Sequence, residues 1–143
     1  MKNYLEGIKK EKEGLVIGFT SVVGDMLHAG HTMMLDECKM YCDYLYVGLI
    51  DDPTKDRPEK NKPVQSLFER YQQLSSHRAV DEVIPLDGED DLDLAIRSLP
   101  IDVRFVGEDY VGKILPEKIL VQNLELKSYI IEESTTYLRR NYA

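Results

Sequence analysis

The stretch that decides the fold runs from residue 15 to residue 50 and reads LVIGFTSVVGDMLHAGHTMMLDECKMYCDYLYVGLI. Residues 15–20 form a short apolar run, which is typical of a buried strand. Residues 28–42 then carry apolar side chains at helical spacing, and residues 44–50 form a second apolar run. A strand, a helix and a strand joined by short connections predict a βαβ unit with two parallel strands.

The rest of the chain continues this alternation. Residues 51–65 are polar and contain prolines, which predicts a long loop. Ser66 and Glu69 form a capping-box pattern at the start of a helix that reaches about His77. Strands are predicted at 82–85, 103–107 and 127–131, with helices at 90–99 and from Ser134 onward. We therefore expect an α/β, Rossmann-like, three-layer α/β/α fold with a mainly parallel five-stranded sheet. Residues 1–143 are predicted to form a single domain, with 1–14 as a charged lead-in.

Composition and charge narrow the classes of function. The chain has 143 residues, 26 acidic and 18 basic side chains, and a formal net charge of -8. Nucleic acid is an unfavourable partner for such a chain, because its affinity depends on Lys and Arg. No apolar run approaches the roughly 20 residues of a membrane span, and the first residues lack a secretory apolar region, so a cytoplasmic protein without a membrane partner is expected. Cys38 and Cys42 are predicted to be buried thiols rather than metal ligands.

The first loop after a strand carries the candidate site, because ligands bind at the carboxyl ends of parallel strands. It contains Asp25-Met-Leu-His28-Ala-Gly-His31. His28 and His31 lie three residues apart at the start of a helix, beside free backbone N–H groups. Gly30 between them allows a bulky anion to approach the backbone. This arrangement predicts a cradle for a triphosphate. The alternative is that His28 only caps the helix and that His31 lies at the edge of the core.

The HAGH motif resembles the HxGH signature of the nucleotidyltransferase superfamily. Three later segments are similar to glycerol-3-phosphate cytidylyltransferases: KPVQSLFER followed by HRAVDEVIP, then VRFVGEDYVGK, then STTYLRR. The resemblance covers residues 15–140. It implies an enzyme that joins CMP from CTP to a small phosphorylated metabolite, such as glycerol 3-phosphate or a similar polyol or alcohol phosphate, and releases pyrophosphate. It also implies Mg²⁺ with the CTP and a homodimer.

The resemblance assigns roles to individual residues. The catalytic residues it implies are His28, His31, Lys62 and Arg139, with Lys60 or Lys55 as a second loop cation. The nucleotide-binding residues it implies are Thr20, Ser21, Asp25, Gly30, Arg78, Asp81, Gly107, Asp109, Ser134, Thr135 and Thr136. Asp25 is also the one candidate protein ligand for Mg²⁺, although phosphate and water oxygens are expected to supply most of the ligands.

Some of these assignments have alternatives. Arg78 and Asp81 can instead form a structural ion pair at a helix-to-strand turn, and residues 134–136 can simply cap a helix. The chain also departs from the family pattern: Val23-Gly24-Asp25 replaces Thr-Phe-Asp, and residues 129–133 replace an Arg-Thr-x-Gly step. Two other functions therefore stay open, an adenylyltransferase that uses ATP on the same fold and a nucleotide-binding module with reduced catalysis.

Overall fold

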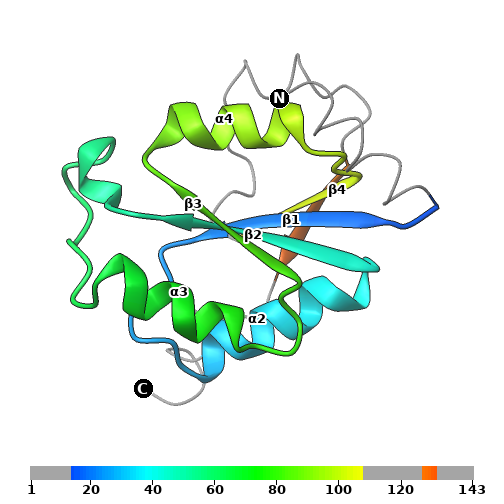
Figure 1. The fold of residues 1–143 in the computed structure, drawn as a ribbon, viewed down its shortest axis with the longest axis horizontal. Coiled ribbons are helices and arrows are strands. Elements are labelled where there is room, and N and C mark those ends of the chain that lie inside the picture. Colours follow the sequence, from blue (N-terminus) through cyan, green and yellow to red (C-terminus); the bar gives the residue numbers. More distant parts are fainter. Residues whose placement is uncertain (1–13, 108–126, 132–143) are drawn as a thin grey trace.

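The computed structural model describes residues 14–107 and 127–131, and it contains one five-stranded sheet with the strand order β3-β2-β1-β4-β5 (Figure 1). Every strand pair in it is parallel. The strands are β1 (Ile17–Val22), β2 (Tyr44–Ile50), β3 (Glu82–Leu86), β4 (Val103–Gly107) and β5 (Lys127–Ile131). The helices are α2 (Ala29–Met40), η1 (Pro53–Lys55), α3 (Leu67–Ser75) and α4 (Glu89–Ser98).

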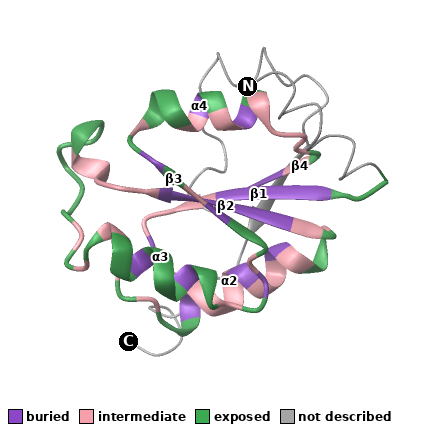
Figure 2. Cartoon of the chain, in the orientation of Figure 1, coloured by how far each residue is buried: buried purple, intermediate pink, exposed green. Residues whose placement is uncertain are grey.

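The helices cover the two faces of the sheet and complete the predicted three layers. Helices α2 and α3 pack on one face and α4 packs on the other (Figure 1). Leu35 and Leu74 join one core cluster beneath α2 and α3, while Ile96 joins a second cluster with Phe19 beneath α4. Figure 2 shows the buried residues concentrated in the strands and on the inner sides of the helices. The α/β fold with a parallel five-stranded sheet is confirmed.

The first strand begins two residues later than the apolar pattern predicts. Val16 is 41% exposed, and its N–H donates to the Asp43 carboxylate at 2.8 Å. The N–H of Ile17 donates to the Asp102 carboxylate at 2.8 Å. These two side chains take the backbone donors at the entrance of β1, so the ladder starts at Ile17 although the apolar run starts at Leu15.

One buried side chain holds the carboxyl ends of the strands together. Arg70 of α3 is 2% exposed. Its guanidinium donates to the carbonyl oxygens of Val23 at 3.0 Å, Ile50 at 2.6 Å, Asp51 at 2.7 Å and Gln65 at 3.2 Å. A buried charge is tolerated when its hydrogen bonds are made in this way. Arg70 therefore fixes the ends of β1 and β2 relative to the loop of residues 51–65.

The strand order places the expected ligand crevice at this edge. Successive strands β1, β2 and β3 run to one side, and β4 then pairs with the other side of β1. Ligands bind where the order reverses in this way, at the carboxyl ends of the strands. None of the described helices is long and apolar enough to span a membrane.

Candidate functional site

The HAGH segment starts helix α2 with a capping box built from its two histidines. His28 is the N-cap residue, and its Nδ1 accepts a hydrogen bond from the N–H of Gly30 at 3.0 Å. The Nδ1 of His31 accepts from the N–H of His28 at 3.2 Å. A neutral imidazole that accepts at Nδ1 carries its proton on Nε2. The capping geometry thus assigns both rings the tautomer with an Nε2–H donor on the side away from the backbone.

The two rings also influence each other. Their centroids lie 4.1 Å apart. Burial and the nearby His28 lower the pKa of His31 from 6.5 to about 4, while the Asp25 carboxylate acts in the opposite direction. His31 is therefore neutral at pH 7, and it presents a hydrogen-bond donor without a full positive charge.

Asp25 connects this helix start to the loop of residues 51–65. Its two carboxylate oxygens accept hydrogen bonds from the N–H groups of Val64 and Gln65, each at 2.9 Å. These two hydrogen bonds lower the pKa of Asp25. The side chain of Gln65 in turn accepts from the N–H of Met26 at 2.5 Å. The end of the loop is thereby fixed against the turn that precedes His28.

A second set of contacts fixes the beginning of the same loop to the start of α4. The Nζ of Lys55 lies 2.5 Å from a carboxylate oxygen of Asp87, and the Nε of Arg57 lies 3.7 Å from a carboxylate oxygen of Glu89. Between them, Asp56 accepts a hydrogen bond from the N–H of Glu89 at 3.0 Å. We call these contacts between residues 55–57 and residues 87–89 the loop clasp.

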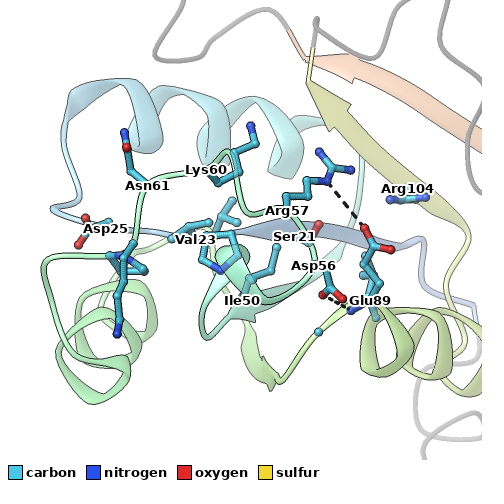
Figure 3. A pocket seen from close by; sticks show the side chains of 16 residues that line it. Ser21, Val23, Asp25, Ile50, Asp56, Arg57, Lys60, Asn61, Glu89 and Arg104 are labelled. Carbon is cyan, nitrogen blue, oxygen red and sulfur yellow. Dashed lines mark hydrogen bonds and ion pairs between the residues drawn. The ribbon is translucent and has the colours of Figure 1, made fainter.

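A cavity of about 440 Å³ lies between the loop, the carboxyl ends of the strands and the start of α4 (Figure 3). Its size is in the range of small-molecule sites. Its lining combines apolar side chains with charged ones. The lining residues are Ser21, Val22, Val23, Asp25, Ile50, Pro53, Asp56, Arg57, Lys60, Asn61, Lys62, Pro63, Gly88, Glu89, Leu92 and Arg104.

Most of the carboxylates at the cavity already have donors from the protein. Asp25 accepts from two backbone N–H groups, Asp56 accepts from another, and Glu89 pairs with Arg57. The lining also includes the cationic side chains of Lys60 and Lys62. The loop side of the cavity therefore offers positive charge to an anionic ligand such as a phosphate group.

Four of the sequence-predicted residues line this cavity: Ser21, Asp25, Lys62 and Lys60, the last of which was one of two choices for the second loop cation. His28 and His31 do not line it. Asp25 links the histidines to the cavity, because it lines the cavity and also lies near His31. The charges of Asp25 and His31 each shift the pKa of the other. Gly30 is buried in the first turn of α2. His28 does cap its helix, through Nδ1, so its Nε2 takes no part in the cap. Whether it only caps the helix stays open.

Thr20, Arg78 and Asp81 lie away from the cavity. The Thr20 hydroxyl is buried and donates to the carbonyl of Phe105 at 3.3 Å. Arg78 makes a two-point ion pair with Asp36, at 3.1 and 2.7 Å. Asp81 pairs with Lys39 and accepts from the N–H of Leu45 at 2.7 Å, at the amino-terminal ends of β2 and β3. Each of the two residues therefore pairs with a residue of α2, and the ion pair between Arg78 and Asp81 of the alternative interpretation is not formed. Their nucleotide contacts stay a prediction.

The remaining predicted residues are at the other end of the chain. Gly107 is the last residue of β4, at the carboxyl edge of the sheet. Asp109, Ser134, Thr135, Thr136 and Arg139 lie outside the described residues.

Sequence reasoning missed several lining residues. Arg57, Glu89 and Arg104 come from three segments that are far apart in the chain, so no local motif contains them. The sequence does contain one local signal for Arg104, because a charged residue is unusual inside a buried parallel strand. Arg70 lies in the KPVQSLFER segment of the family resemblance, which does not indicate the four carbonyl contacts by which it organises the edge of the sheet.

The described residues do not fit a metal ion held by the protein alone. Among residues 14–107 and 127–131, no group of three His, Cys, Asp or Glu side chains is placed to hold one. Both oxygens of Asp25, the one predicted ligand, accept backbone N–H groups.

Comparison with known sequences gives a consistent result. A family model described as cytidylyltransferase-like matches residues 25–141. The bifunctional protein HldE of Campylobacter fetus subsp. fetus is 32% identical over 132 residues, which cover 92% of this chain and 29% of that protein. The bifunctional protein HldE of Wolinella succinogenes is 36% identical over 124 residues, covering 86% and 26% respectively. The chain thus spans less than a third of the length of these relatives.

Solved structures share the fold. A lipopolysaccharide core biosynthesis protein from Thermoplasma volcanium GSS1 superposes with a TM-score of 0.69 at 24% identity, over 84% of this chain and 98% of that one. The pantoate-beta-alanine ligase from Francisella tularensis, complexed with beta-gamma ATP and beta-alanine, superposes with a TM-score of 0.61 at 16% identity. The superposition covers 90% of this chain and 63% of that one. At these identities the two likenesses concern the fold alone.

Proposed function

The chain belongs to the cytidylyltransferase-like family, and on this premise we propose that it transfers CMP from CTP to a small phosphorylated metabolite, a polyol or alcohol phosphate, and releases pyrophosphate. One observation carries the proposal. The two histidines of the HAGH segment are held by their own capping box through Nδ1, so their Nε2–H groups take no part in it. Asp25, whose charge acts on His31, lines the cavity together with Lys60 and Lys62.

In the proposed reaction the triphosphate lies at the start of α2. The Nε2–H groups of His28 and His31 donate to phosphate oxygens, and the helix N-terminus adds further attraction for negative charge. Because the capping box already fixes both rings, little reorganisation is needed when charge develops on the leaving pyrophosphate.

The acceptor occupies the cavity with its phosphate toward Lys62. An oxygen of the acceptor phosphate forms a bond with the α-phosphorus of CTP while the bond from that phosphorus to the bridging oxygen of pyrophosphate breaks. Pyrophosphate leaves with the electron pair of the broken bond, and no covalent enzyme intermediate forms. Catalysis then consists of positioning and charge neutralisation. Mg²⁺ enters as the magnesium complex of CTP, that is, as part of the substrate.

A melting-temperature panel with CTP, ATP, GTP and UTP in the presence of Mg²⁺ tests the nucleotide, since a ligand that binds only the folded state raises the melting temperature. CTP is expected to give the largest rise. A larger rise with ATP would instead support an adenylyltransferase on the same fold.

Pyrophosphate release with glycerol 3-phosphate and other phosphorylated polyols tests the chemistry. We expect release in the wild type and at least a hundredfold loss in Lys62→Ala, because a cation at the reacting phosphates is removed. Glu59→Ala is the matched control, since Glu59 is exposed in the same loop and does not line the cavity. Nucleotide binding without any pyrophosphate release would indicate a binding module that lacks catalysis. We also propose a homodimer, which sedimentation velocity tests.

A further inference from the structure

Arg104 is a buried cation that lies in the wall of the cavity. It is the second residue of β4, in register with Phe19 of β1, and it is 5% exposed. Phe105 next to it faces the core beneath α2 and α3, so the alternation of side chains along a strand directs Arg104 to the α4 face. There its side chain lines the cavity together with Ser21 and Leu92.

The comparison with Arg70 shows why this position is informative. Both guanidinium groups are buried, but Arg70 donates to four backbone carbonyls and does not line the cavity. Its role is to hold the fold together. Arg104 instead presents its side chain at the surface of a space large enough for a small molecule. Burying a charged side chain is costly, and a position at a ligand site is one reason to retain it.

The two ends of the cavity differ in charge. Figure 3 shows Asn61 and Asp25 at one end, and Arg57, Glu89 and Arg104 at the other. We call the second group, with Asp56, the far end. The far end has two guanidinium groups and two carboxylates, so its formal charges cancel. Lys62, next to Asn61 in the chain, lines the cavity on the loop side.

A second phosphate is a poor ligand for the far end. The far end already holds the carboxylates of Asp56 and Glu89, which would repel an added anion. Hydroxyl groups fit better, because each one both donates and accepts a hydrogen bond. A guanidinium supplies donors only and a carboxylate supplies acceptors only, so the two together match a row of hydroxyls.

We propose that Arg104 and Glu89 form a specificity pair that reads the hydroxyl groups of the acceptor at the end remote from its reacting phosphate. The inference rests on the proposed function, in which Lys62 receives that phosphate. It implies that the acceptor is a phosphate ester with several hydroxyl groups and not a simple alkyl phosphate. A site whose polar groups hydrogen-bond the hydroxyls of a ligand favours that ligand over analogues that lack them.

Calorimetric titration of the full chain with ethyl phosphate, glycerol 3-phosphate and glucose 1-phosphate tests the pair. In the wild type we expect the two hydroxylated ligands to bind at least about tenfold more tightly than ethyl phosphate, which corresponds to one hydrogen bond to a charged group. Arg104→Met is expected to abolish this advantage and to leave the affinity for ethyl phosphate unchanged. Lys62→Ala is expected to weaken all three ligands by a similar factor.

Glu89→Gln keeps the test decisive if Arg104→Met does not fold. The Glu89 side chain is 52% exposed, so its amide variant is expected to fold, and it too should lose most of the hydroxyl advantage. The proposal is overturned if the wild type binds the hydroxylated ligands no more tightly than ethyl phosphate. It is also overturned if the Arg104 and Glu89 variants keep the tighter binding of the hydroxylated ligands. Pyrophosphate release from CTP is measured separately on the wild type. If no acceptor supports release, the proposed function fails, whereas the binding ratios still decide the role of Arg104 and Glu89.

Discussion

Asp56 caps a helix to which it does not belong: its carboxylate accepts a hydrogen bond from the backbone N–H of Glu89 at 3.0 Å. The N-cap position of α4 is Gly88, which has no side chain to make such a bond. Gly88 has a φ of +158°, and a Cβ built on it would lie 3.0 Å from an oxygen of Asp56. The carboxylate thus takes the place that an N-cap side chain would fill, and it comes from a residue 33 positions away.

Removing this cap should destabilise the protein modestly. Asp56→Ala is expected to lower the free energy of unfolding by about 1 kcal/mol, the usual value for a lost N-cap. Asp56→Asn should retain most of it, because an amide oxygen also accepts the bond. Urea unfolding measures both, with Glu59→Ala as the loop control. Equal stability of Asp56→Ala and the wild type would show that the contact contributes nothing.

Arg70 should be far more sensitive than any surface arginine. Arg70→Met leaves four carbonyl oxygens without their donor, and we expect a loss of about 3 kcal/mol or more in the free energy of unfolding. Arg78→Gln breaks an ion pair whose arginine side chain is 81% exposed, so its loss should stay below about 1 kcal/mol. Chemical denaturation compares the two. Similar losses in both variants would contradict the assigned role of Arg70.

The capping and catalytic roles of the HAGH histidines can be separated. His28→Asn and His31→Gln retain side chains that suit the two capping positions, but both lose the Nε2–H donor. We expect near-wild-type melting temperatures and at least about a hundredfold less pyrophosphate release. His28→Ala should lose both the turnover and about 1 kcal/mol of stability. Full turnover in the two cap-retaining variants would exclude these rings from the reaction.

His31 should also make the free energy of unfolding fall as the pH is lowered. Its pKa is about 4 in the folded protein and 6.5 for an unperturbed histidine. Between these values the unfolded state binds more protons, so stability is full above pH 6.5 and falls as the pH drops toward 4. The pKa of Asp25 is also lowered in the folded protein. The stability that Asp25 contributes, however, begins to fall only when the pH approaches its ordinary pKa of 3.8.

The contribution of His31 is measured by comparing the unfolding midpoints of the wild type and His31→Gln between pH 4 and pH 6.5. The wild type should lose stability more steeply between pH 6.5 and pH 4 than the variant. Parallel profiles would mean that His31 titrates as an exposed histidine.

Local patterns in the sequence predicted the elements that depend on neighbouring residues. The apolar run at Tyr44–Ile50 gave its strand with the correct bounds, because a strand buried on both faces needs little else to define it. Ser66 and Glu69 form the predicted capping box, with both reciprocal hydrogen bonds present. The HAGH segment does begin a helix after the first strand.

The parts of the site that the sequence did not predict depend on contacts between distant residues. Asp25 was assigned to nucleotide or metal, yet its carboxylate fixes residues 64 and 65, which lie some 40 positions away. Arg78 and Asp81 matched a family segment, but that segment lies at the amino-terminal ends of the strands. Proximity of this kind follows from the order of strands in the sheet, which no short motif encodes.

The loop clasp has a consequence for how the chain tolerates a change of length. Three consecutive residues, 55–57, contact Asp87 and Glu89, so each contact depends on the spacing of the other two. One residue inserted between 55 and 57 would shift the charges out of alignment and expose the end of α4. Residues 58–61 follow the clasp and are exposed, so the same insertion there leaves it intact. We therefore expect the loop to tolerate a change of length at residues 58–61 and not between residues 55 and 57.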